Sequence, residues 1–200
     1  MSSHVNKKPM VVVISGPSGV GKDATIARMR QRGGKFHYVV TATTRVRRPG
    51  ETDGIDYYFL SEEEFKERVD KNEFLEYAKV YNYMYGVLKS EVQQALAKGE
   101  DVIIKVDVQG AATLKSKIPN AVFIFLEAPS IDDLAERLKN RKADSEHSVN
   151  VRIGKAEEEM KAREIFNYTV VNTSGNLDLT VKAVQEYVDK CRGKQGPVII

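Results

Sequence analysis

Cysteine is nearly absent from this sequence. The 200 residues include one cysteine, Cys191, so an internal disulfide framework is excluded, and no group of cysteine and histidine has the spacing of a structural zinc site. No apolar run approaches the roughly 18 residues that span a bilayer, and residues 1–10 lack the apolar region of a secretory signal. We therefore expect a soluble protein of a reducing compartment, the cytoplasm, with no membrane partner.

A strong excess of one charge is also absent. Lysine and arginine number 31 and aspartate and glutamate 28, which gives a formal net charge of +3. Nucleic-acid binding usually requires a clustered basic face, so we expect no nucleic-acid partner. Hydrophobic residues make up 42% of the chain, which is enough for one packed domain of this length.

Short, almost wholly apolar runs alternate with helical segments along the chain. Such runs are typical of strands buried on both faces of a parallel sheet. Ser61 and Glu64 have the spacing of a capping box, which predicts a helix start. The alternation predicts an α/β fold with helices on both faces of the sheet. Strands are expected at residues 10–15, 37–43, 56–60, 101–106, 122–126 and 168–172. Helices are expected at residues 23–32, 61–71, 88–98, from 130, at 149–165 and at 177–192, with a mobile connection at 142–148.

A glycine-rich loop follows the first predicted strand. Residues 16–22 read G-P-S-G-V-G-K, which fits the phosphate-loop pattern G-x-x-x-x-G-K. The glycines let backbone N–H groups converge on phosphate oxygens, the lysine reaches the β- and γ-phosphates, and the start of the following helix favours an anion. The sequence therefore predicts a nucleotide-phosphate site made of Gly16, Pro17, Ser18, Gly19, Val20, Gly21 and Lys22.

Asp23 departs from the phosphate-loop pattern, which has serine or threonine after the lysine as a Mg²⁺ ligand. A carboxylate is also a hard ligand for Mg²⁺, so Asp23 is a candidate metal ligand. Its negative charge would lie close to the nucleotide phosphates, and the residue could instead simply cap the helix. Both interpretations stay open here.

A second dense group of polar residues lies between residues 41 and 57 (TATTRVRRPGETDGIDY). Arg45 and Arg48 can present planar, bidentate donors to a phosphate, and Tyr57 adds a phenol donor. Turn signals at residues 49–50 and 53–54 favour a small β unit. Arginine-rich surface loops are common, so this segment alone leaves a phosphate site and a solvated loop equally open.

Three segments, in this order, resemble the guanylate kinase family. They are the phosphate loop, T-T-R-x-x-R-P-G-E at residues 43–51 with Gly54 and Tyr57, and F-L-E…Y-G at residues 74–76 and 85–86. The sequence V-D-V-Q-G at residues 106–110 and arginines at lid spacing extend the resemblance over residues 10–188. It implies a nucleoside-monophosphate-kinase fold with a parallel core sheet, a small β-rich GMP-binding subdomain and a helical lid.

The resemblance also implies how the chain is divided. We expect a single domain at residues 9–190, with flexible tails at residues 1–8 and 193–200. The core would comprise residues 9–40, 100–137 and 165–190, the GMP-binding subdomain residues 41–99, and the lid residues 138–160.

By this resemblance, the second polar group binds GMP. Its arginines and tyrosines would hold the phosphate, and Glu76 would accept hydrogen bonds from the adjacent N1 and N2 donors of guanine, a pair that adenine does not present. Glu76 could otherwise be a surface charge at a strand end, and the tyrosines could be ordinary packing residues. The implied GMP-binding residues are Thr41, Arg45, Arg48, Tyr57, Glu76, Tyr85 and Asp107.

The resemblance further implies a lid that closes over ATP. Arg141 and Arg152 would contact the transferred phosphoryl group, Arg137 would lie near the ATP, and Asn172 would flank adenine. Neutralisation of charge by arginine is typical of phosphoryl transfer. Arg137 and Arg141 are four residues apart, so they could instead make side-chain pairs on a solvated helix face.

Two further positions depart from the family pattern. Val87 stands where a serine or threonine hydroxyl would contact guanine O6, so we expect a raised KM for GMP and weaker rejection of other purines. Lys105 stands beside the phosphate loop where the family carries aspartate, while Asp23 has appeared in that loop. One hypothesis is that a carboxylate has moved between two neighbouring positions and preserves the charge around Mg²⁺; the other is independent drift.

The leading hypothesis is a kinase of purine nucleotide metabolism that transfers the γ-phosphoryl group of Mg-ATP to GMP, giving ADP and GDP. A protein-binding module without catalysis usually has an eroded phosphate loop, and a ribose-phosphate kinase would not need Glu76 with its arginines and tyrosines. We expect ATP and GMP as partners, Mg²⁺ as the cofactor, and a monomer or homodimer. The expected catalytic residues are Lys22, Arg45, Arg141 and Arg152.

Overall fold

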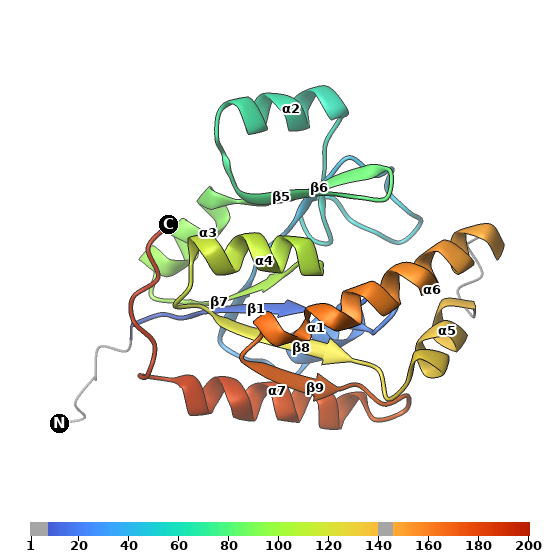
Figure 1. Ribbon diagram of the computed structural model, residues 1–200. Helices are drawn as coiled ribbons and strands as arrows, with labels where there is room; N and C mark the ends of the chain where they lie inside the picture. Colours follow the sequence, from blue (N-terminus) through green and yellow to red (C-terminus); the bar gives the residue numbers. More distant parts are fainter. Residues whose placement is uncertain (1–7, 140–145) are drawn as a thin grey trace.

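The computed structural model describes residues 8–139 and 146–200 and is shown in Figure 1. Within these residues the core is a parallel five-stranded sheet in the order β2-β7-β1-β8-β9. The prediction of an α/β fold with a parallel core sheet is therefore confirmed. The core strands are β1 (Val11–Ser15), β2 (Phe36–Tyr38), β7 (Asp101–Lys105), β8 (Val122–Glu127) and β9 (Tyr168–Val171).

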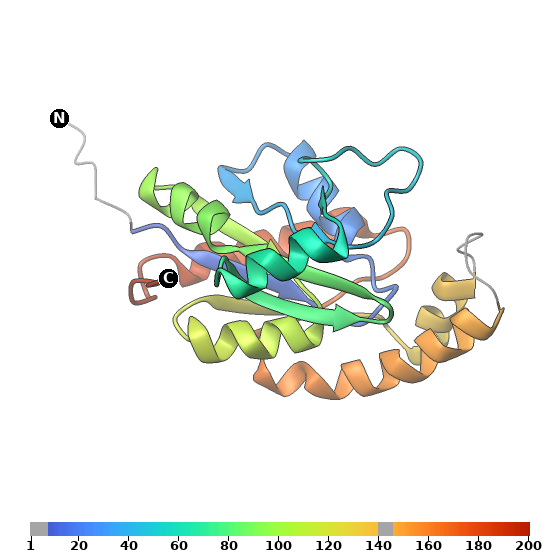
Figure 2. The ribbon, with the colours of Figure 1, turned by 90° about the horizontal axis from the view of Figure 1, so that it is seen from above.

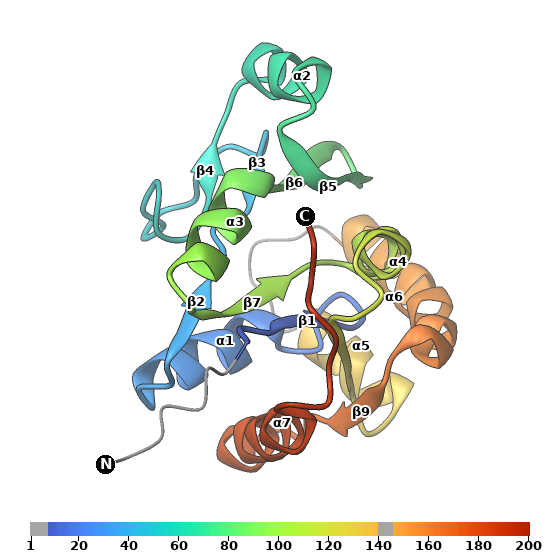
Figure 3. The same ribbon diagram turned by 90° about the vertical axis from the view of Figure 1, so that its left-hand side faces the viewer.

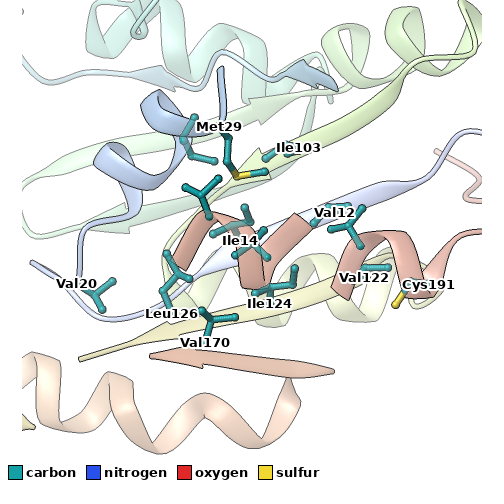
Figure 4. Close-up of a cluster of buried hydrophobic side chains, with 14 of the residues drawn as sticks. Val12, Ile14, Val20, Met29, Ile103, Val122, Ile124, Leu126, Val170 and Cys191 are labelled. Carbon is teal, nitrogen blue, oxygen red and sulfur yellow. The ribbon is translucent and has the colours of Figure 1, made fainter. Parts of the chain in front are cut away.

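Helices cover both faces of this sheet, as the end-on view in Figure 3 shows. Successive side chains of a strand point to opposite faces. Val12 and Ile14 of β1 therefore join a buried cluster with α1 (Lys22–Gln31) and α7 (Leu177–Cys191) (Figure 4). Val11 and Val13 pack on the other face with α3 (Lys89–Ala97) and α4 (Val108–Lys117). Because both faces are covered, the strand is apolar throughout, and this is the signal by which the sequence predicts it.

A second sheet, in the order β4-β3-β6-β5, forms a separate layer above the core in Figure 1. The helix α2 (Glu62–Asp70) begins at the predicted capping box and packs on this sheet through Phe65, whose ring lies 4.5 Å from that of Phe74. We call this unit the upper subdomain; its strands are β3 (Ala42–Thr43), β4 (Tyr58–Phe59), β5 (Phe74–Val80) and β6 (Tyr83–Leu88).

The upper subdomain departs most from the sequence predictions. The resemblance implies a β-rich subdomain over residues 41–99, but the sequence pattern marks no individual strands where β5 and β6 lie. The single strand expected at residues 37–43 is two strands, β2 and β3, that belong to different sheets. The strand expected at residues 56–60 is reduced to the two residues of β4. β5 is buried in its first half and half-exposed in its second, so it lacks the continuous apolar run that marks the core strands.

Two helices follow the core strand β8 along the chain, α5 (Ile131–Lys139) and α6 (Glu146–Lys161), and α6 is extended by the short 3₁₀ helix η1 (Ala162–Ile165). The helix predicted at residues 149–165 thus starts three residues earlier, in part of the expected mobile connection; residues 142–145 of that connection lie outside the described part. Figure 2 shows α6 running past the tip of the β5–β6 hairpin.

The carboxyl-terminal segment differs from the frayed tail expected at residues 193–200. Val198 and Ile200 pack against the cluster that contains α3 and α4. Gln93 and Asn120 donate side-chain hydrogen bonds to the carbonyl oxygens of Ile200 and Pro197, both at 3.1 Å. Val198 and Ile200 are thus partly buried, whereas Ile199 between them is exposed. None of the helices in the described ranges has the length and apolar character needed to cross a bilayer.

Candidate functional site

A cavity of about 430 Å³ lies between the core sheet, the upper subdomain and α6. Both groups of residues predicted to bind nucleotide, which are far apart in the sequence, contribute to its wall. The predicted site residues that line it are Ser18, Gly19, Gly21, Lys22, Asp23, Thr41, Arg45, Arg48, Tyr57, Glu76, Tyr85 and Asp107. Outside its lining lie Gly16, Pro17, Val20, Arg137 and Asn172.

The phosphate loop connects β1 to α1, and at three of its positions, Gly16, Gly19 and Gly21, a Cβ would lie closer than 3.0 Å to a neighbouring atom. Gly16 has a φ of 146°, and a Cβ there would lie 2.1 Å from the carbonyl oxygen of Leu126 in β8. Gly21 has a φ of 100° and precedes α1, and a Cβ there would lie 2.5 Å from Nδ2 of Asn172. The two glycines therefore allow the loop to fold tightly against β8 and β9.

Lys22 lies over the loop. Its Nζ atom donates hydrogen bonds to the carbonyl oxygens of Gly16, at 2.6 Å, and Pro17, at 3.0 Å. Burial lowers the pKa of Lys22, whereas the nearby carboxylates of Glu159 and Asp23 raise it. The ammonium group is thus held at the loop, where the phosphate-loop pattern places it.

Asn172 and Arg137 lie outside the cavity lining and support the phosphate loop by hydrogen bonds. The Asn172 side chain donates to the carbonyl oxygen of Val20 at 2.7 Å and accepts from Thr180 Oγ1 at 2.8 Å. Arg137 donates to the carbonyl oxygens of Val20, at 3.3 Å, and Asn172, at 2.7 Å. These contacts support the loop, while the contact of Asn172 with adenine stays a prediction.

Glu159 of α6 contacts the loop from the other side, although no sequence pattern singles it out. Its side chain is buried and accepts a hydrogen bond from the backbone N–H of Ser18 at 2.8 Å. Burial raises the pKa of Glu159, against the lowering effect of the Ser18 amide and of Lys22. The two partners are 141 positions apart, so only the folded chain brings them together.

Arg45 is buried at the centre of the predicted phosphate-binding group. Its guanidinium donates to Glu51 Oε1 and to the carbonyl oxygen of Val46, both at 2.7 Å. It also lies 5.4 Å from the centre of the Tyr57 ring, which in turn lies 6.1 Å from the Tyr85 ring. One arginine and two tyrosines are thus gathered into a rigid group on the cavity wall.

Glu51 fixes both predicted arginines, although it was not predicted as a site residue. Its second oxygen, Oε2, accepts from the backbone N–H of Arg48 at 2.8 Å, and the Arg48 side chain itself is exposed. Burial raises the pKa of Glu51, but the hydrogen bonds from Arg45 and Arg48 outweigh burial and hold the pKa below its usual value. Glu51 ends the T-T-R-x-x-R-P-G-E segment, so its position in that pattern was a usable signal.

Glu76 of β5 lines the cavity and is only 3% exposed. Burial and the nearby Asp107 carboxylate raise its pKa to about 8, despite the opposing effect of Lys117. Asp107 caps α4 by accepting from the backbone N–H of Gly110 at 2.8 Å. A Cβ on Gly110 would lie 2.6 Å from Glu76 Oε1, so glycine here makes room for the carboxylate.

Two other predicted positions lie near Glu76. Thr41, which is buried, also lines the cavity. Val87 of β6 is fully buried and pairs with Glu76 across the β5–β6 ladder. Its side chain packs in the core cluster with Leu75 and Val92 and is not part of the cavity lining.

Asp23 and Lys105 are neighbours, as the opposite changes of charge at these two positions lead us to expect. Lys105 Nζ lies 2.5 Å from Asp23 Oδ1 and also donates to the Tyr57 hydroxyl at 3.2 Å. Burial alone would lower the pKa of Lys105, but Asp23 and Tyr57 together raise it above its ordinary value. The hypothesis that the two exchanges preserve the local charge does not hold. Asp23 and Lys105 together carry no net charge, whereas the serine or threonine and the aspartate of the family pattern would together carry one negative charge.

A contact between α6 and the upper subdomain closes one side of the cavity. Tyr81, at the tip of the β5–β6 hairpin, lines the cavity and has a left-handed backbone with φ 55°. Lys155 of α6 lies with its Nζ 4.7 Å from the centre of the Tyr81 ring. Neither residue was predicted from the sequence.

Of the predicted lid arginines, Arg141 lies outside the described residues, and Arg152 lies in α6. Within residues 8–139 and 146–200 no group of three or more histidine, cysteine, aspartate or glutamate side chains could hold a metal ion.

Comparisons with known proteins give a consistent result. Residues 8–191 match the family model for guanylate kinase. The chain is 47% identical over 188 residues to the chloroplastic/mitochondrial guanylate kinase 2 of rice. That alignment covers 94% of this chain and 66% of the longer rice protein. It is 42% identical over 187 residues to the guanylate kinase of Thermotoga maritima, covering 94% of this chain and 89% of the other.

The fold has solved counterparts too. The crystal structure of guanylate kinase from Anaplasma phagocytophilum superimposes with a TM-score of 0.77 at 24% identity, covering 94% of this chain and 88% of the other. At that level of identity the match concerns the fold alone.

Proposed function

Because the chain belongs to the guanylate kinase family, its reaction is the transfer of a phosphoryl group from ATP to GMP, and we propose how its residues divide that work. The observation that supports the division is that one cavity joins the phosphate loop, the group of Arg45, Tyr57 and Tyr85, and the buried Glu76. Donor and acceptor nucleotides can thus meet end to end inside it.

ATP binds at the phosphate loop. Backbone N–H groups of the loop face the β- and γ-phosphates, and the ammonium group of Lys22, held at the loop carbonyls, is within reach of them. Arg137 and Asn172 keep the loop in place from behind. Asn172 is also our candidate for the contact with adenine.

The GMP phosphate binds to Arg45, Arg48, Tyr57 and Tyr85. Arg45 is buried and already fixed by Glu51, so its guanidinium loses little freedom when it binds an anion. Arg48 is exposed at the rim of the cavity and supplies a second cation. The two tyrosines add phenol donors to the same group.

Guanine binds at Glu76, with Thr41 and Asp107 beside it. The ionised carboxylate accepts from the N1 and N2 donors of guanine, which adenine lacks, so Glu76 selects the base. A pKa of about 8 means that Glu76 holds a proton in much of the GMP-free protein at neutral pH. Two hydrogen bonds to the carboxylate favour its ionised form, so GMP binding releases that proton.

The transfer step needs positioning and charge neutralisation more than acid–base chemistry. The attacking atom is an oxygen of the GMP phosphate, which is already anionic, so no general base is required. Lys22, at the phosphate loop, and Arg45, in the proposed GMP-phosphate group, both line the cavity in which the phosphoryl group moves. Arg141 and Arg152 are the candidates that complete the neutralisation from the lid.

Mg²⁺ is the expected cofactor, and the residues present suit an ion that arrives on the ATP phosphates. Asp23 contributes an exposed carboxylate at the start of α1, on the cavity wall, but one of its oxygens is 2.5 Å from Lys105 Nζ. Mg²⁺ commonly binds through one or two carboxylates together with substrate phosphates and water. When bound, the ion would neutralise phosphate charge, and Asp23 is the residue that would hold it.

We further propose a cytoplasmic enzyme that acts as a monomer or homodimer and has ATP and GMP, not nucleic acid, as its partners. The near balance of basic and acidic residues and the single cysteine support this proposal. 

A coupled assay of ADP release tests the function. With Mg-ATP and GMP we expect turnover in the range of about 1–100 s⁻¹, and far slower turnover with AMP, CMP or UMP. Binding of GMP without turnover would contradict the kinase activity and would favour a binding module. Equal rates with AMP and GMP would contradict the role of Glu76.

A further inference from the structure

Lys105 occupies an unusual position, at the junction between the ATP side and the GMP side of the cavity. It ends β7, where it pairs with Ile14 of β1 next to the phosphate loop. Its Nζ atom lies 2.5 Å from Asp23 Oδ1 at the start of α1 and 3.2 Å from the hydroxyl of Tyr57 in the upper subdomain. The same atom lies 4.8 Å from the centre of the Tyr57 ring. One ammonium group therefore joins a residue of each substrate site.

The chemistry of an ammonium group determines the direction of the second hydrogen bond. Lysine can only donate, so the Tyr57 oxygen must be the acceptor in its contact with Lys105. A phenol has a single proton, and that proton is then available to another acceptor. With Lys105 in place, Tyr57 is a donor toward the cavity, which is the role that a phosphate oxygen requires.

The surroundings hold this arrangement in place. The Tyr57 ring is fixed between the guanidinium of Arg45, at 5.4 Å, and the ring of Tyr85, at 6.1 Å. Lys105 is mostly buried, with 21% of its side chain exposed, and the Asp23 carboxylate offsets its charge. Neither partner of the hydrogen bond can turn away without losing a second contact.

We propose that Lys105 is a positioning residue for GMP: it orients the Tyr57 hydroxyl as a hydrogen-bond donor to the acceptor phosphate, and Asp23 anchors Lys105 for this purpose. The inference rests on the proposed function, in which Tyr57 binds the GMP phosphate. It differs from a purely structural role for Lys105, because a lysine that only offsets the charge of Asp23 would affect stability and leave GMP binding unchanged.

A double-mutant cycle tests the proposal. Lys105→Met removes the donor and Tyr57→Phe removes the hydroxyl that it orients. We expect each single variant to raise the Kd for GMP, measured by calorimetry without ATP, and its KM about tenfold, which corresponds to the loss of one hydrogen bond. In the Tyr57→Phe background, Lys105→Met should add less than about twofold, because no hydroxyl is left to orient.

Three other variants make the cycle specific. Lys105→Arg, another donor-only cation, should restore GMP binding to within about threefold of the wild type. Lys105→Gln covers the case in which Lys105→Met does not fold, and it should weaken GMP binding in the same direction. Lys115→Met is the matched control: Lys115 is a half-buried lysine 4.5 Å from the centre of the Phe123 ring, away from the cavity, and its replacement should leave the GMP Kd unchanged.

The outcomes separate this inference from the proposed function. If Tyr57→Phe leaves GMP binding unchanged, both the assignment of Tyr57 and the role of Lys105 are wrong. If Tyr57→Phe weakens GMP binding but neither Lys105→Met nor Lys105→Gln does, the role of Lys105 is wrong and the assignment of Tyr57 stands. If the effects of the two substitutions multiply, Lys105 acts independently of Tyr57, which also contradicts the proposal.

Discussion

At Glu76, burial and a neighbouring carboxylate both oppose ionisation, yet the proposed contact with guanine requires the ionised form. The side chain is 3% exposed and faces Asp107, and its pKa is raised to about 8. The free energy needed to ionise this residue therefore opposes GMP binding. The hydrogen bonds from guanine N1 and N2 offset it, whereas adenine lacks this pair of donors. If Glu76 binds guanine as proposed, selectivity and pH dependence are properties of the same carboxyl group.

We predict that GMP binding at pH 7 releases most of one proton. Below its pKa of about 8, Glu76 is protonated in the GMP-free protein, and the hydrogen bonds to guanine favour its ionised form. The release should fall toward zero at pH 9, where Glu76 is already ionised. Calorimetry in buffers of different ionisation enthalpy measures the release. Glu76→Gln is the control: it keeps any release from the GMP phosphate, so the difference between the two proteins is the release from Glu76. An equal release from both proteins would contradict the prediction.

The same pKa shift predicts the pH dependence of stability. The folded pKa, about 8, lies above the ordinary value of 4.5, so the folded protein binds more protons than the unfolded chain between these values, and its stability falls as the pH rises through them. Glu76→Gln removes this loss. Its free energy of unfolding should exceed that of the wild type at pH 8, by a margin that shrinks by up to about 1.4 kcal/mol for each pH unit toward pH 5.

Val87 tests base recognition at the neighbouring position. Val87→Thr keeps the side-chain shape and adds a hydroxyl at the position that pairs with Glu76 across the hairpin. We expect the KM for GMP to fall about fivefold and the preference for GMP over AMP to rise, because guanine O6 gains a donor. The free energy of unfolding should fall by about 1 kcal/mol, since Val87 is fully buried. An unchanged ratio of AMP to GMP rates would contradict this explanation.

At the scale of elements, α6 makes two contacts that link the cavity walls. Glu159 accepts from the backbone of Ser18 in the phosphate loop, and Lys155, one turn earlier, lies over the Tyr81 ring in the hairpin. Residues four apart lie on the same side of a helix. A displacement of α6 therefore affects the ATP loop and the upper subdomain together.

We predict that Glu159→Ala raises the KM for ATP about tenfold, because Ser18 loses a charge-assisted hydrogen bond and Lys22 loses a nearby carboxylate. The GMP Kd measured without ATP should change little. Glu158→Ala, which removes an exposed carboxylate from the same helix turn, is the control and should behave like the wild type. Steady-state kinetics measure both, and equal effects of the two variants would exclude a specific role for Glu159.

The elements that the sequence predicts well are those with a local signal. β1, β7 and β8 are continuous apolar runs because both of their faces are covered, and α2 is marked by its capping box. β5 and β6 are buried at one end of the hairpin and partly exposed at the other, and β5 has a bulge near Glu76, so their pattern is broken. The short strands β3 and β4 owe their existence to pairing with residues far along the chain.

The residues of the site follow the same division. The phosphate loop and the arginine segment carry local patterns, and the structure brings Lys22, Arg45, Tyr57 and Glu76 to one cavity. Glu159 could not be found in this way, because its partner is 141 positions away. Contacts of this kind depend on how the layers stack, and no short segment encodes them.

At the scale of the whole molecule, a polar cluster joins the upper subdomain to the core. Glu91 of α3 accepts from Tyr58 of β4 at 2.6 Å and is hydrogen-bonded to His37 of β2 at 3.0 Å. The hydrogen bond to Glu91 raises the pKa of Tyr58 to about 12, so the phenol remains a donor at neutral pH. Glu91 thus links the two sheets, and α6 links the phosphate loop to the β5–β6 hairpin.

Because the cavity spans these linked parts, substrates should stabilise the whole fold. At a GMP concentration one hundred times its Kd, the free energy of unfolding should rise by about 2.7 kcal/mol, or roughly 5–10 °C in the melting temperature for a chain of this size. AMP at the same concentration should give a much smaller shift, and Glu76→Gln should reduce the response to GMP. Thermal denaturation measures each case, and equal shifts with GMP and AMP would contradict selection by the cavity.

The contact between Asp23 and Lys105 has a consequence for how such sequences diverge. A chain with Lys105 alone would bury an ammonium group with no carboxylate beside it, and a chain with Asp23 alone would hold a carboxylate at the phosphate loop with no lysine to offset its charge. We expect either single state to be less favourable than the pair. Positions 23 and 105 should therefore be inherited as a unit, with one combination or the other fixed in each lineage of relatives.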